Sequence, residues 1–331
     1  MESLKVLSGN NMGSAMIQFS FVIPCLNEAR HIRQCLQSLQ NQTIPRDQFE
    51  IIVVDNGSSD DSVRISRELA DKVCIEPDLK VGALRNFGAR LAQGEILIFI
   101  DADCTLPANW LDRLSQQSLS SNQRLVLGGG CELPPDATWI ETHWLLEGPN
   151  GNALPKDLLG CSIVIGKSFF NEVGGFNETM SSGEDSELST RLKNAGGEVH
   201  ISRDANVIHW GNAKTQKAFV KRQIWHAESY SEDLMRNLKD PVFLITVGFG
   251  FCLAATVGAF ALQSSSLWLF ATFLFLFPIP LTLKRYKRAS RVPRSLSELA
   301  RSYYLDLLYL SARLYRLVTL TTRRILLIHL K

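Results

Sequence analysis

The chain has 331 residues and a formal net charge of +2. This length is enough for one large core plus an appendage, and the near-neutral charge gives no electrostatic indication of nucleic-acid binding. Seven cysteines are scattered along the chain and no Cys-x-x-Cys motif occurs. The cysteines therefore indicate reduced, buried thiols of a cytosolic protein rather than a disulfide framework or a zinc site.

Composition divides the chain into four segments. Residues 1–16 are polar and lack the apolar core of a signal peptide, so we expect a disordered lead. Residues 17–240 have the composition of a soluble catalytic domain. Residues 241–283 are strongly apolar, and residues 284–331 are basic with regularly spaced leucines.

The expected elements of the first half alternate between strand and helix. Short apolar runs predict strands at 19–24, 49–54, 72–76 and 95–100, and helical spacing predicts helices at 29–40, 62–71 and 82–92. Val- and Ile-rich strands separated by helices are typical of an α/β fold with a mainly parallel sheet and helices on both faces. Ligands of such sheets bind beyond the carboxyl ends of the strands.

Polar side chains follow three of these strands. Asn27, Asp55 and the triplet Asp101-Ala102-Asp103 all fall at strand ends. Because side chains at i and i+2 of a strand point to the same side, Asp101 and Asp103 are expected to face one site. Two such carboxylates would repel each other without a shared cation, and a hard divalent ion, Mg or Mn, is the natural partner. A solvated turn is the alternative.

Two further residues have competing interpretations. Asp55 either closes a turn before a helix or accepts hydrogen bonds from a base or ribose. Arg85, early in the helix at 82–92, is either a surface arginine or a contact for a diphosphate or base, since arginine pairs well with phosphate.

The motifs, taken in order, resemble those of the family 2 glycosyltransferases of GT-A fold, a Rossmann-like architecture. The resemblance covers about residues 17–230 and rests on Val22-Ile23-Pro24-x-x-Asn27-Glu28, Val53-Val54-Asp55-Asn56-Gly57-Ser58-x-Asp60, Arg85-Asn86-x-Gly88, Phe99-Ile100-Asp101-x-Asp103, Gly174-Gly175-Phe176-x-Glu178 and Gly183-Glu184-Asp185-x-Glu187-Leu188-x-x-Arg191-Leu192. No single element is specific, but the order and spacing together are.

The resemblance implies a role for each matched residue. The donor, for which UDP is the commonest nucleotide of the family, would lie against Pro24, Asn27, Glu28, Asp55, Arg85, Asp101 and Ala102. Asp103, with Asp101, would hold the Mg or Mn ion that acts as a Lewis acid on the diphosphate. Asp185, beside Glu184, would be the general base of an inverting displacement; a helix start that favours acidic residues is the structural alternative, and both can hold.

The remaining assignments concern the end of the catalytic domain. The resemblance suggests that His209 completes the metal site, and a packed histidine is the alternative. The chain lacks the Gln-x-x-Arg-Trp box of processive family members, which indicates addition of a single sugar. Arg222 and Trp225 are candidate acceptor contacts. Trp139 and Trp144, in the segment that usually differs on the acceptor side, are expected to pack rather than to stack on a sugar.

The apolar segment predicts a membrane hairpin. Residues 242–262 and 267–283 carry no charge, and the first run is about 30 Å long as a helix. Pro278 and Pro280 are expected to kink or stop the second helix. Six basic residues follow between 284 and 294, so the positive-inside rule places that end and the catalytic domain in the cytoplasm. A re-entrant insertion and a hairpin packed on the soluble core are the alternatives.

The tail repeats leucine or tyrosine at steps of three and four, with arginines between. This pattern suits an amphipathic helix on an anionic membrane surface, and packing against a partner helix is the competing interpretation.

The expected function is transfer of one sugar from a nucleotide-diphosphate sugar to a lipid-linked or membrane-proximal saccharide acceptor. Two alternatives stay open. Asp101-x-Asp103-x-Thr105 after an apolar strand also resembles the nucleophile motif of haloacid dehalogenase-type phosphohydrolases, but two acid-tipped strands precede it here. A catalytically degenerate membrane scaffold is the other alternative, and the presence of both Asp103 and Asp185 argues against it.

Overall fold

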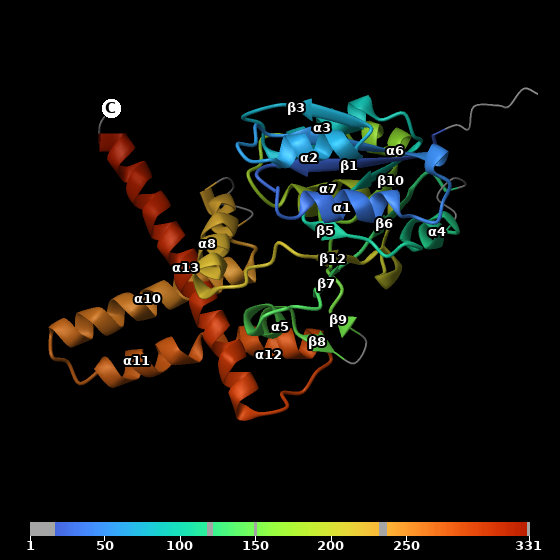
Figure 1. Cartoon of the computed structure of the whole chain (residues 1–331). Coiled ribbons are helices and arrows are strands. Elements are labelled where there is room, and N and C mark those ends of the chain that lie inside the picture. The colour runs from blue at the N-terminus through green and yellow to red at the C-terminus, as the bar shows by residue number, and fades with distance from the viewer. Residues whose placement is uncertain (1–16, 118–121, 149–150, 232–236, 330–331) are drawn as a thin grey trace, which may run out of the picture.

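The computed structural model describes residues 17–117, 122–148, 151–231 and 237–329 (Figure 1). The predicted lead at 1–16 lies outside the described residues. A seven-stranded sheet forms the centre, in the order β11-β6-β10-β4-β1-β2-β3. Its strands are β1 (Phe19–Cys25), β2 (Phe49–Asp55), β3 (Lys72–Ile75), β4 (Ile96–Phe99), β6 (Leu125–Gly128), β10 (Ile163–Gly166) and β11 (Glu198–Ile201).

The sheet is mainly parallel, as predicted. Strand β1 pairs in parallel with β2 and β4, β2 with β3, and β6 with β11. Only β10 runs against its neighbours β4 and β6 within this sheet. The carboxyl ends of β1, β2 and β4 consequently meet at one edge, which brings the predicted site residues to the same side of the domain.

Helices cover both faces because successive strand residues point in opposite directions. Phe21 and Ile23 of β1 belong to the core under α1 (Ile32–Gln40), α2 (Ser62–Leu69) and α4 (Trp110–Ser115). Val22, between them, belongs to the core under α3 (Val81–Leu91), α6 (Lys167–Glu172) and α7 (Glu184–Asn194). Each fully buried aliphatic or aromatic side chain of these two cores contributes about 1.5–3 kcal/mol.

A second, smaller sheet extends the site edge. It has the order β5-β12-β7, with β5 (Cys104–Thr105), β12 (Val207–His209) and β7 (Cys131–Glu132). The antiparallel pairing of β12 with β5 sets His209 opposite Cys104. A separate pair, β8 (Glu147–Gly148) and β9 (Gly151–Asn152), follows α5 (Trp139–Leu145). Among the described residues of the domain there are also three short 3-10 helices: η1 (Arg46–Gln48), η2 (Arg203–Ala205) and η3 (Ala227–Ser231).

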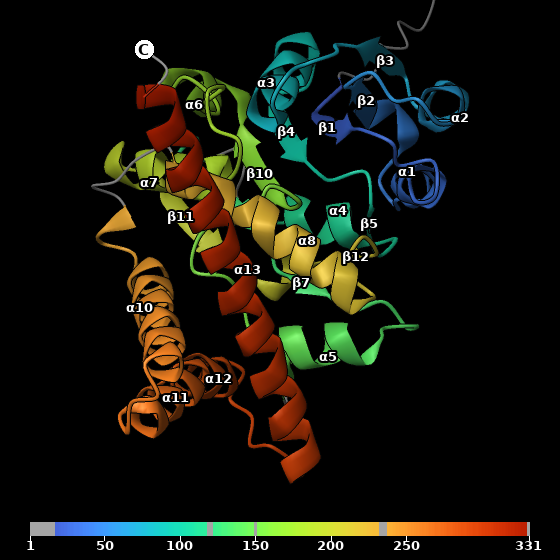
Figure 2. The same cartoon turned by 90° about the vertical axis from the view of Figure 1, so that its left-hand side faces the viewer.

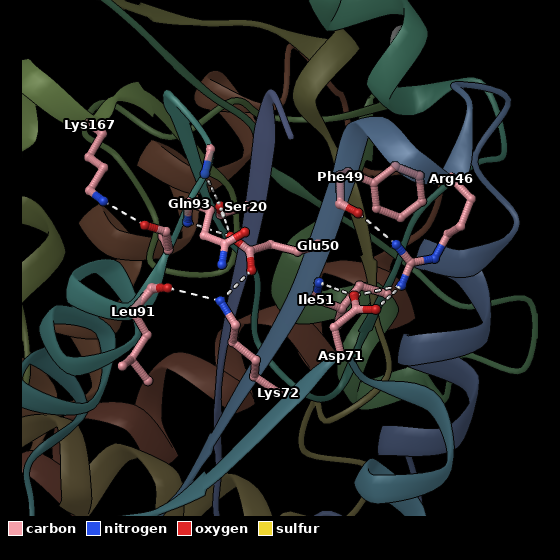
Figure 3. A network of polar contacts seen from close by, with 12 residues as sticks. Ser20, Arg46, Phe49, Glu50, Ile51, Asp71, Lys72, Leu91, Gln93 and Lys167 are labelled. Carbon is pink, nitrogen blue, oxygen red and sulfur yellow. Dashed lines mark hydrogen bonds and ion pairs between the residues drawn. The ribbon is translucent and has the colours of Figure 1, made fainter. Parts of the chain in front are cut away.

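The opposite edge of the sheet holds a polar network with a structural role (Figure 3). Glu50, which is buried at the start of β2, accepts hydrogen bonds from Ser20 Oγ at 2.7 Å and Lys72 Nζ at 2.8 Å. Arg46 binds Asp71 beside it. Since Glu50 is paired and hydrogen-bonded, its charge is tolerated inside the fold, and the network fixes the beginnings of three strands.

The apolar segment forms a hairpin, α10 (Pro241–Ala261) followed by α11 (Leu267–Leu276) and α12 (Pro278–Arg288). Asp240 caps α10 by accepting a hydrogen bond from the backbone N–H of Val242 at 2.9 Å. The break between α11 and α12 falls at Phe277, immediately before Pro278, as the prolines predict. Helix α12 continues past residue 283, the predicted end of the membrane hairpin, through the basic residues to Arg288.

Two helical stretches, Pro241–Ala261 and Leu267–Arg288, are long and apolar enough to cross a membrane. The hairpin projects away from the sheet domain (Figure 1). Large apolar side chains cover its surface: Phe251 is 74% exposed and Trp268 is 78% exposed. An apolar surface of this kind on a projecting element marks a site that another apolar phase or protein covers.

The tail forms one long helix, α13 (Leu296–His329), which connects the parts of the molecule. Figure 2 shows α13 between α8 (Gln216–His226) on one side and the helices α10 to α12 on the other. Leu305 and Leu310 of α13 are fully buried in these contacts. This side of α13 packs against helices of the same chain, as in the competing interpretation of the tail.

A buried ion pair joins α12, α13 and α5. The guanidinium of Arg285 contacts Asp306 Oδ2 at 2.6 Å and also donates hydrogen bonds to the carbonyls of His143 at 2.8 Å and Trp144 at 3.2 Å. Its charge lies 4.6 Å from the centre of the Trp144 ring. The last carbonyls of α5, which have no partner within that helix, are therefore satisfied by a residue of the hairpin.

Candidate active site

Arg85 organises the carboxyl edge of the sheet. Its side chain is 3% exposed and forms ion pairs with Glu184 Oε1 and Asp101 Oδ1, each at 2.7 Å. The structure thus brings three predicted site residues into one network, contributed by α3, α7 and the loop after β4. The position of Arg85 is that of a buried, paired arginine and not of a surface residue.

The Arg85 network predicts a large effect on stability. Arg85→Gln leaves the Glu184 carboxylate buried without its partner, and loss of one partner of a buried pair costs about 3–5 kcal/mol. We expect the free energy of unfolding, measured by denaturant titration, to fall by that amount. Arg90→Gln is the matched control, because Arg90 lies on the same helix with 63% of its side chain exposed. A loss below about 1 kcal/mol for Arg85→Gln would contradict the role of the network.

The triplet Asp101-Ala102-Asp103 forms a turn and not the end of a strand. Strand β4 ends at Phe99, and the N–H of Cys104 donates to the carbonyl of Asp101 at 3.0 Å. The prediction that strand geometry places the side chains of Asp101 and Asp103 on one side is therefore wrong. Instead the turn directs the Asp101 carboxylate to Arg85 and the Asp103 carboxylate to His209, while Ala102 is buried in the core.

Asp103 and His209 form a group that can hold a metal. Asp103 Oδ2 lies 3.6 Å from His209 Nε2, and ligand atoms of Asp103, Cys104 and His209 all lie within 4.8 Å of one another. Any side chain at Gly211 would collide with the Asp103 carboxylate, so the small residue keeps this space open. A carboxylate and an imidazole suit Mn or a similar divalent ion, and the residues present therefore fit a metal.

Glu28 lies close to this group. Burial raises the pKa of Glu28, the hydrogen bond from His31 opposes the rise, and the negative charge of Asp103 reinforces it. A cation shared by Glu28 and Asp103 would relieve the repulsion between their carboxylates.

Asp55 and Asn27 shape the loop over this edge. The fully buried Asp55 carboxylate accepts hydrogen bonds from Gly57 N at 2.9 Å, Ser58 N at 2.7 Å and Ser58 Oγ at 2.6 Å. Asn27 adopts a positive φ of 55° and accepts from Ser59 N at 2.8 Å. Asp55 thus closes its own turn, and Pro24 lies buried in β1. Contact of these residues with a donor stays a prediction.

Asp185 lies in the first turn of α7, whose N-cap residue Gly183 has a φ of 78°. Its carboxylate accepts hydrogen bonds from Gly160 N at 3.0 Å and Ser186 N at 2.7 Å. Burial, together with the charge of Glu184, raises the pKa of Asp185 to about 6. A carboxylate with this pKa is ionised at neutral pH and basic enough to accept a proton, as a general base requires.

A cavity of about 190 Å³ adjoins the Asp103–His209 group and lies between α5 and α8. It is lined by Cys131, Ile140, Glu141, Trp144, Leu145, His209, Asn212, Ala213, Phe219, Arg222, Gln223 and His226. The structure therefore brings Arg222 to the cavity, whereas Trp225 is 45% exposed and packs beside His226. Trp144 packs against Phe219 at 4.9 Å between ring centres, as predicted.

Three residues of the site were not predicted from the sequence. Gly160 acts through its backbone N–H, Gly211 through its lack of a side chain, and Gln223 is one of two glutamines in its helix. No local pattern distinguishes them, because their roles arise from segments that meet only in the folded chain.

Comparison with known proteins agrees with the fold. Residues 20–169 match the sequence model of "Glycosyl transferase family 2". The chain is 28% identical over 212 residues to glycosyltransferase AglE of Haloferax volcanii, covering 60% of this chain and 68% of that protein. It is 27% identical over 232 residues to succinoglycan biosynthesis protein ExoA of Rhizobium meliloti, covering 65% and 68%.

A solved structure shares the architecture. The mannosyltransferase PcManGT of Pyrobaculum calidifontis, in complex with GDP-Man and Mn²⁺, superposes with a TM-score of 0.54 at 18% identity, covering 89% of this chain and 85% of that one. The fold is thus GT-A, a class of nucleotide-sugar-dependent transferases. Within it, residues 20–169 of this chain match the family 2 glycosyltransferases, and the comparisons support activity on nucleotide sugars. This similarity argues against the phosphohydrolase alternative.

Proposed function

We propose that the protein transfers a single sugar, with inversion, from a nucleotide-diphosphate sugar to a hydroxyl of a lipid-linked or membrane-proximal saccharide acceptor. The observation that carries the proposal is the position of Asp185, a partly buried carboxylate with raised pKa on the same edge as the Asp103–His209 group. A base and a diphosphate-binding group on one edge are the two parts that an in-line displacement needs.

In this mechanism Asp185 accepts the proton of the acceptor hydroxyl as its oxygen attacks the anomeric carbon. Hydrogen bonds from Gly160 and Ser186 hold the carboxylate in place, and Arg85 holds Glu184 next to it. The bond from the anomeric carbon to the diphosphate breaks in the same step, and the nucleoside diphosphate leaves.

Asp103 and His209, with Asp101 nearby, are the residues that would hold Mg or Mn. When bound, such an ion supplies Lewis-acid stabilisation of the charge on the departing diphosphate. Mn²⁺ accompanies GDP-Man in PcManGT, which supports the choice of a divalent ion. Pro24, Asn27, Glu28, Asp55 and Ala102 remain the proposed surroundings of the donor, with UDP favoured as its nucleotide.

The proposal is tested with membranes that contain the full-length chain. A panel of UDP-, GDP- and dTDP-sugars is incubated with Mn²⁺ or Mg²⁺, and release of the nucleoside diphosphate is measured with and without lipid extracts. We expect one donor to stand out and its turnover to rise when the extract supplies the acceptor. Absence of nucleotide release from every sugar nucleotide would refute the proposal.

We further propose that the hairpin anchors the protein in the membrane with the catalytic domain in the cytoplasm. The exposed apolar surface of α10 and α11 supports insertion, and the basic end of α12 supports a cytoplasmic orientation. The competing interpretation is a hairpin covered by protein.

This arrangement predicts the behaviour of the chain on fractionation. The full-length protein should sediment with membranes and resist extraction by high salt or carbonate, because its anchor is apolar rather than electrostatic. Phe251→Lys combined with Trp268→Lys places charges on the exposed face and should release much of it. Lys239→Glu, a charge change outside the hairpin, is the control. Salt extraction of the unaltered protein would argue against insertion.

A further inference from the structure

A second cavity lies between α5 and the start of α13. Its volume is about 230 Å³, and every described residue that lines it has a polar side chain. Thr142 and His143 of α5 contribute to it from one side, and the loop between α12 and α13 contributes from the other, together with the first turns of α13. Sites that enclose a drug-sized ligand measure roughly 300–1,000 Å³, so this smaller cavity suits a single polar group.

The lining of this cavity is strongly basic, because Arg291, Arg294 and Arg301 all contribute to it. They belong to residues 284–301, which contain seven basic residues and one acidic residue. This segment therefore has a net charge of +6 in a chain whose total is +2. Arginine suits phosphate especially well, since its planar guanidinium offers several N–H donors.

Glu298 is the only carboxylate among the described residues that line the cavity, and both of its oxygens have partners. Its Oε1 accepts from Arg291 Nη2 at 2.6 Å and from the Tyr286 hydroxyl at 3.3 Å, and its Oε2 accepts from the Arg294 N–H at 2.8 Å. Glu298 thus offsets the charge of Arg291. The exposed guanidinium groups of Arg294 and Arg301 form no ion pair with any carboxylate that the structure describes, so two positive charges remain.

His143 responds to the same charges. Burial lowers the pKa of His143, while its hydrogen bond to the Trp139 carbonyl opposes this change. The charge of Arg301 lowers the pKa further, Glu298 acts in the opposite direction, and Arg291 again lowers it. The imidazole is therefore neutral at pH 7, so the attraction of the cavity for an anion comes from its arginines.

Two apolar side chains beside the cavity are almost fully exposed. Leu296 is 85% exposed and Val292 is 81% exposed, and both lie within the same short stretch as Arg294. The start of α13 lies at the bottom of the molecule in both views, on the side of the hairpin and away from the large sheet (Figures 1 and 2). A free phosphate offers nothing to these apolar side chains, whereas a membrane presents lipid phosphates next to an apolar layer.

We propose that this cavity binds the phosphate of an anionic membrane lipid. Arg294 and Arg301 pair with the headgroup, and Val292 and Leu296 insert into the apolar layer next to it. The inference rests on the proposed membrane anchor and adds a headgroup site at its basic end, because α12 leads from the hairpin directly into this loop. A lipid bound against α5 then holds the catalytic domain in one orientation on the membrane.

The test compares lipids that differ only in their headgroup. Full-length protein in a neutral detergent is titrated with dihexanoyl phosphatidylglycerol or with dihexanoyl phosphatidylcholine, and native mass spectrometry counts the bound lipid. We expect phosphatidylglycerol to bind at least about tenfold more tightly, because the choline cation of the other lipid is repelled by the arginines. Inorganic phosphate and glycerol phosphate should bind at least about tenfold more weakly than phosphatidylglycerol, since they have no acyl chains.

Variants then locate the effect. Arg294→Gln combined with Arg301→Gln should remove the preference for phosphatidylglycerol. The matched control is Lys284→Gln combined with Lys287→Gln, which removes the same charge from exposed residues of α12 outside the cavity. This control should keep the preference, because salt screens charges that do not touch the ligand.

The apolar pair is tested separately. Val292→Ser combined with Leu296→Ser should weaken binding of both lipids and should leave binding of glycerol phosphate unchanged. Thermal unfolding of each variant without lipid checks that the fold is intact.

The outcomes are distinct. Equal affinity for the two lipids, or an unchanged preference in the double arginine variant, overturns the inference. Loss of the preference in the lysine control as well shows diffuse attraction to the basic segment, and this result also overturns the site. Glycerol phosphate bound as tightly as phosphatidylglycerol identifies a soluble ligand and rejects the lipid. None of these results affects the apolar anchor or sugar transfer, which carbonate extraction and nucleotide release test independently.

Discussion

Replacing Asp185 by asparagine is expected to lower kcat by about two to four orders of magnitude, the range typical for removal of a general base. Asparagine keeps the size of the side chain and can still accept a hydrogen bond from Gly160, but it cannot take a proton. Binding of the donor should therefore persist. Single-turnover transfer and donor binding by calorimetry measure the two properties separately.

The pH profile gives an independent check on Asp185. The base must be ionised to act, and burial together with Glu184 raises its pKa to about 6. The transfer rate should therefore be level above that pH and should fall about tenfold per unit below it. In the asparagine variant this acidic limb should disappear.

A matched control comes from Asp157→Asn, which makes the same change at an exposed residue that pairs with Lys193. It should leave the rate within about twofold of the unaltered enzyme, as exposed pairs contribute little. An Asp185→Asn enzyme that retains more than a third of the rate would remove Asp185 from the mechanism.

Asp103→Ala is expected to abolish metal-dependent turnover, with a loss of at least about a hundredfold, because it removes the carboxylate that faces His209. Binding of Mn²⁺ to the ligand-free protein, followed by electron paramagnetic resonance, should weaken in parallel. Chelation of divalent ions should lower the rate of the unaltered enzyme to that of Asp103→Ala. Added Mn²⁺ should restore the rate of the unaltered enzyme but not that of the variant.

Comparison with Asp101→Asn separates the two acids of the triplet. The Asp101 carboxylate is already paired with Arg85, so its loss should weaken Mn²⁺ binding less than the loss of Asp103. Asp47→Ala is the surface control, since Asp47 is exposed on η1. Equal Mn²⁺ affinity in Asp103→Ala and the unaltered protein would refute the assignment. Donor turnover that survives in both Asp103→Ala and Asp185→Asn would remove the proposed mechanism.

The sequence predicts the parallel half of the sheet well because its strands are strongly apolar and their ends are polar. Asp55 ends β2 as expected, and α3 begins within one residue of its predicted start. These features depend on local spacing of apolar residues, which the sequence contains directly.

The parts that the sequence does not predict depend on distant pairing. His209 reaches Asp103 through the pairing of β12 with β5, and β5 has only two residues. A two-residue strand carries no periodicity. Likewise Gly160 reaches Asp185, and Arg285 of α12 reaches Asp306 of α13, only because separate segments pack together.

The hydrogen bonds from Arg285 to the end of α5 have a practical consequence for work with a shortened enzyme. Helix α5 supplies Trp144 and Leu145 to the cavity wall, while Arg285 of α12 and Ser302 of α13 donate hydrogen bonds to the carbonyl of His143 near its end. A chain cut after Asp240 to obtain a soluble protein would retain the sheet and the acidic turn. It would lose the support of one cavity wall, so hydrolysis of the donor could persist where faithful transfer does not. The hairpin should therefore stay in any preparation used to identify the acceptor.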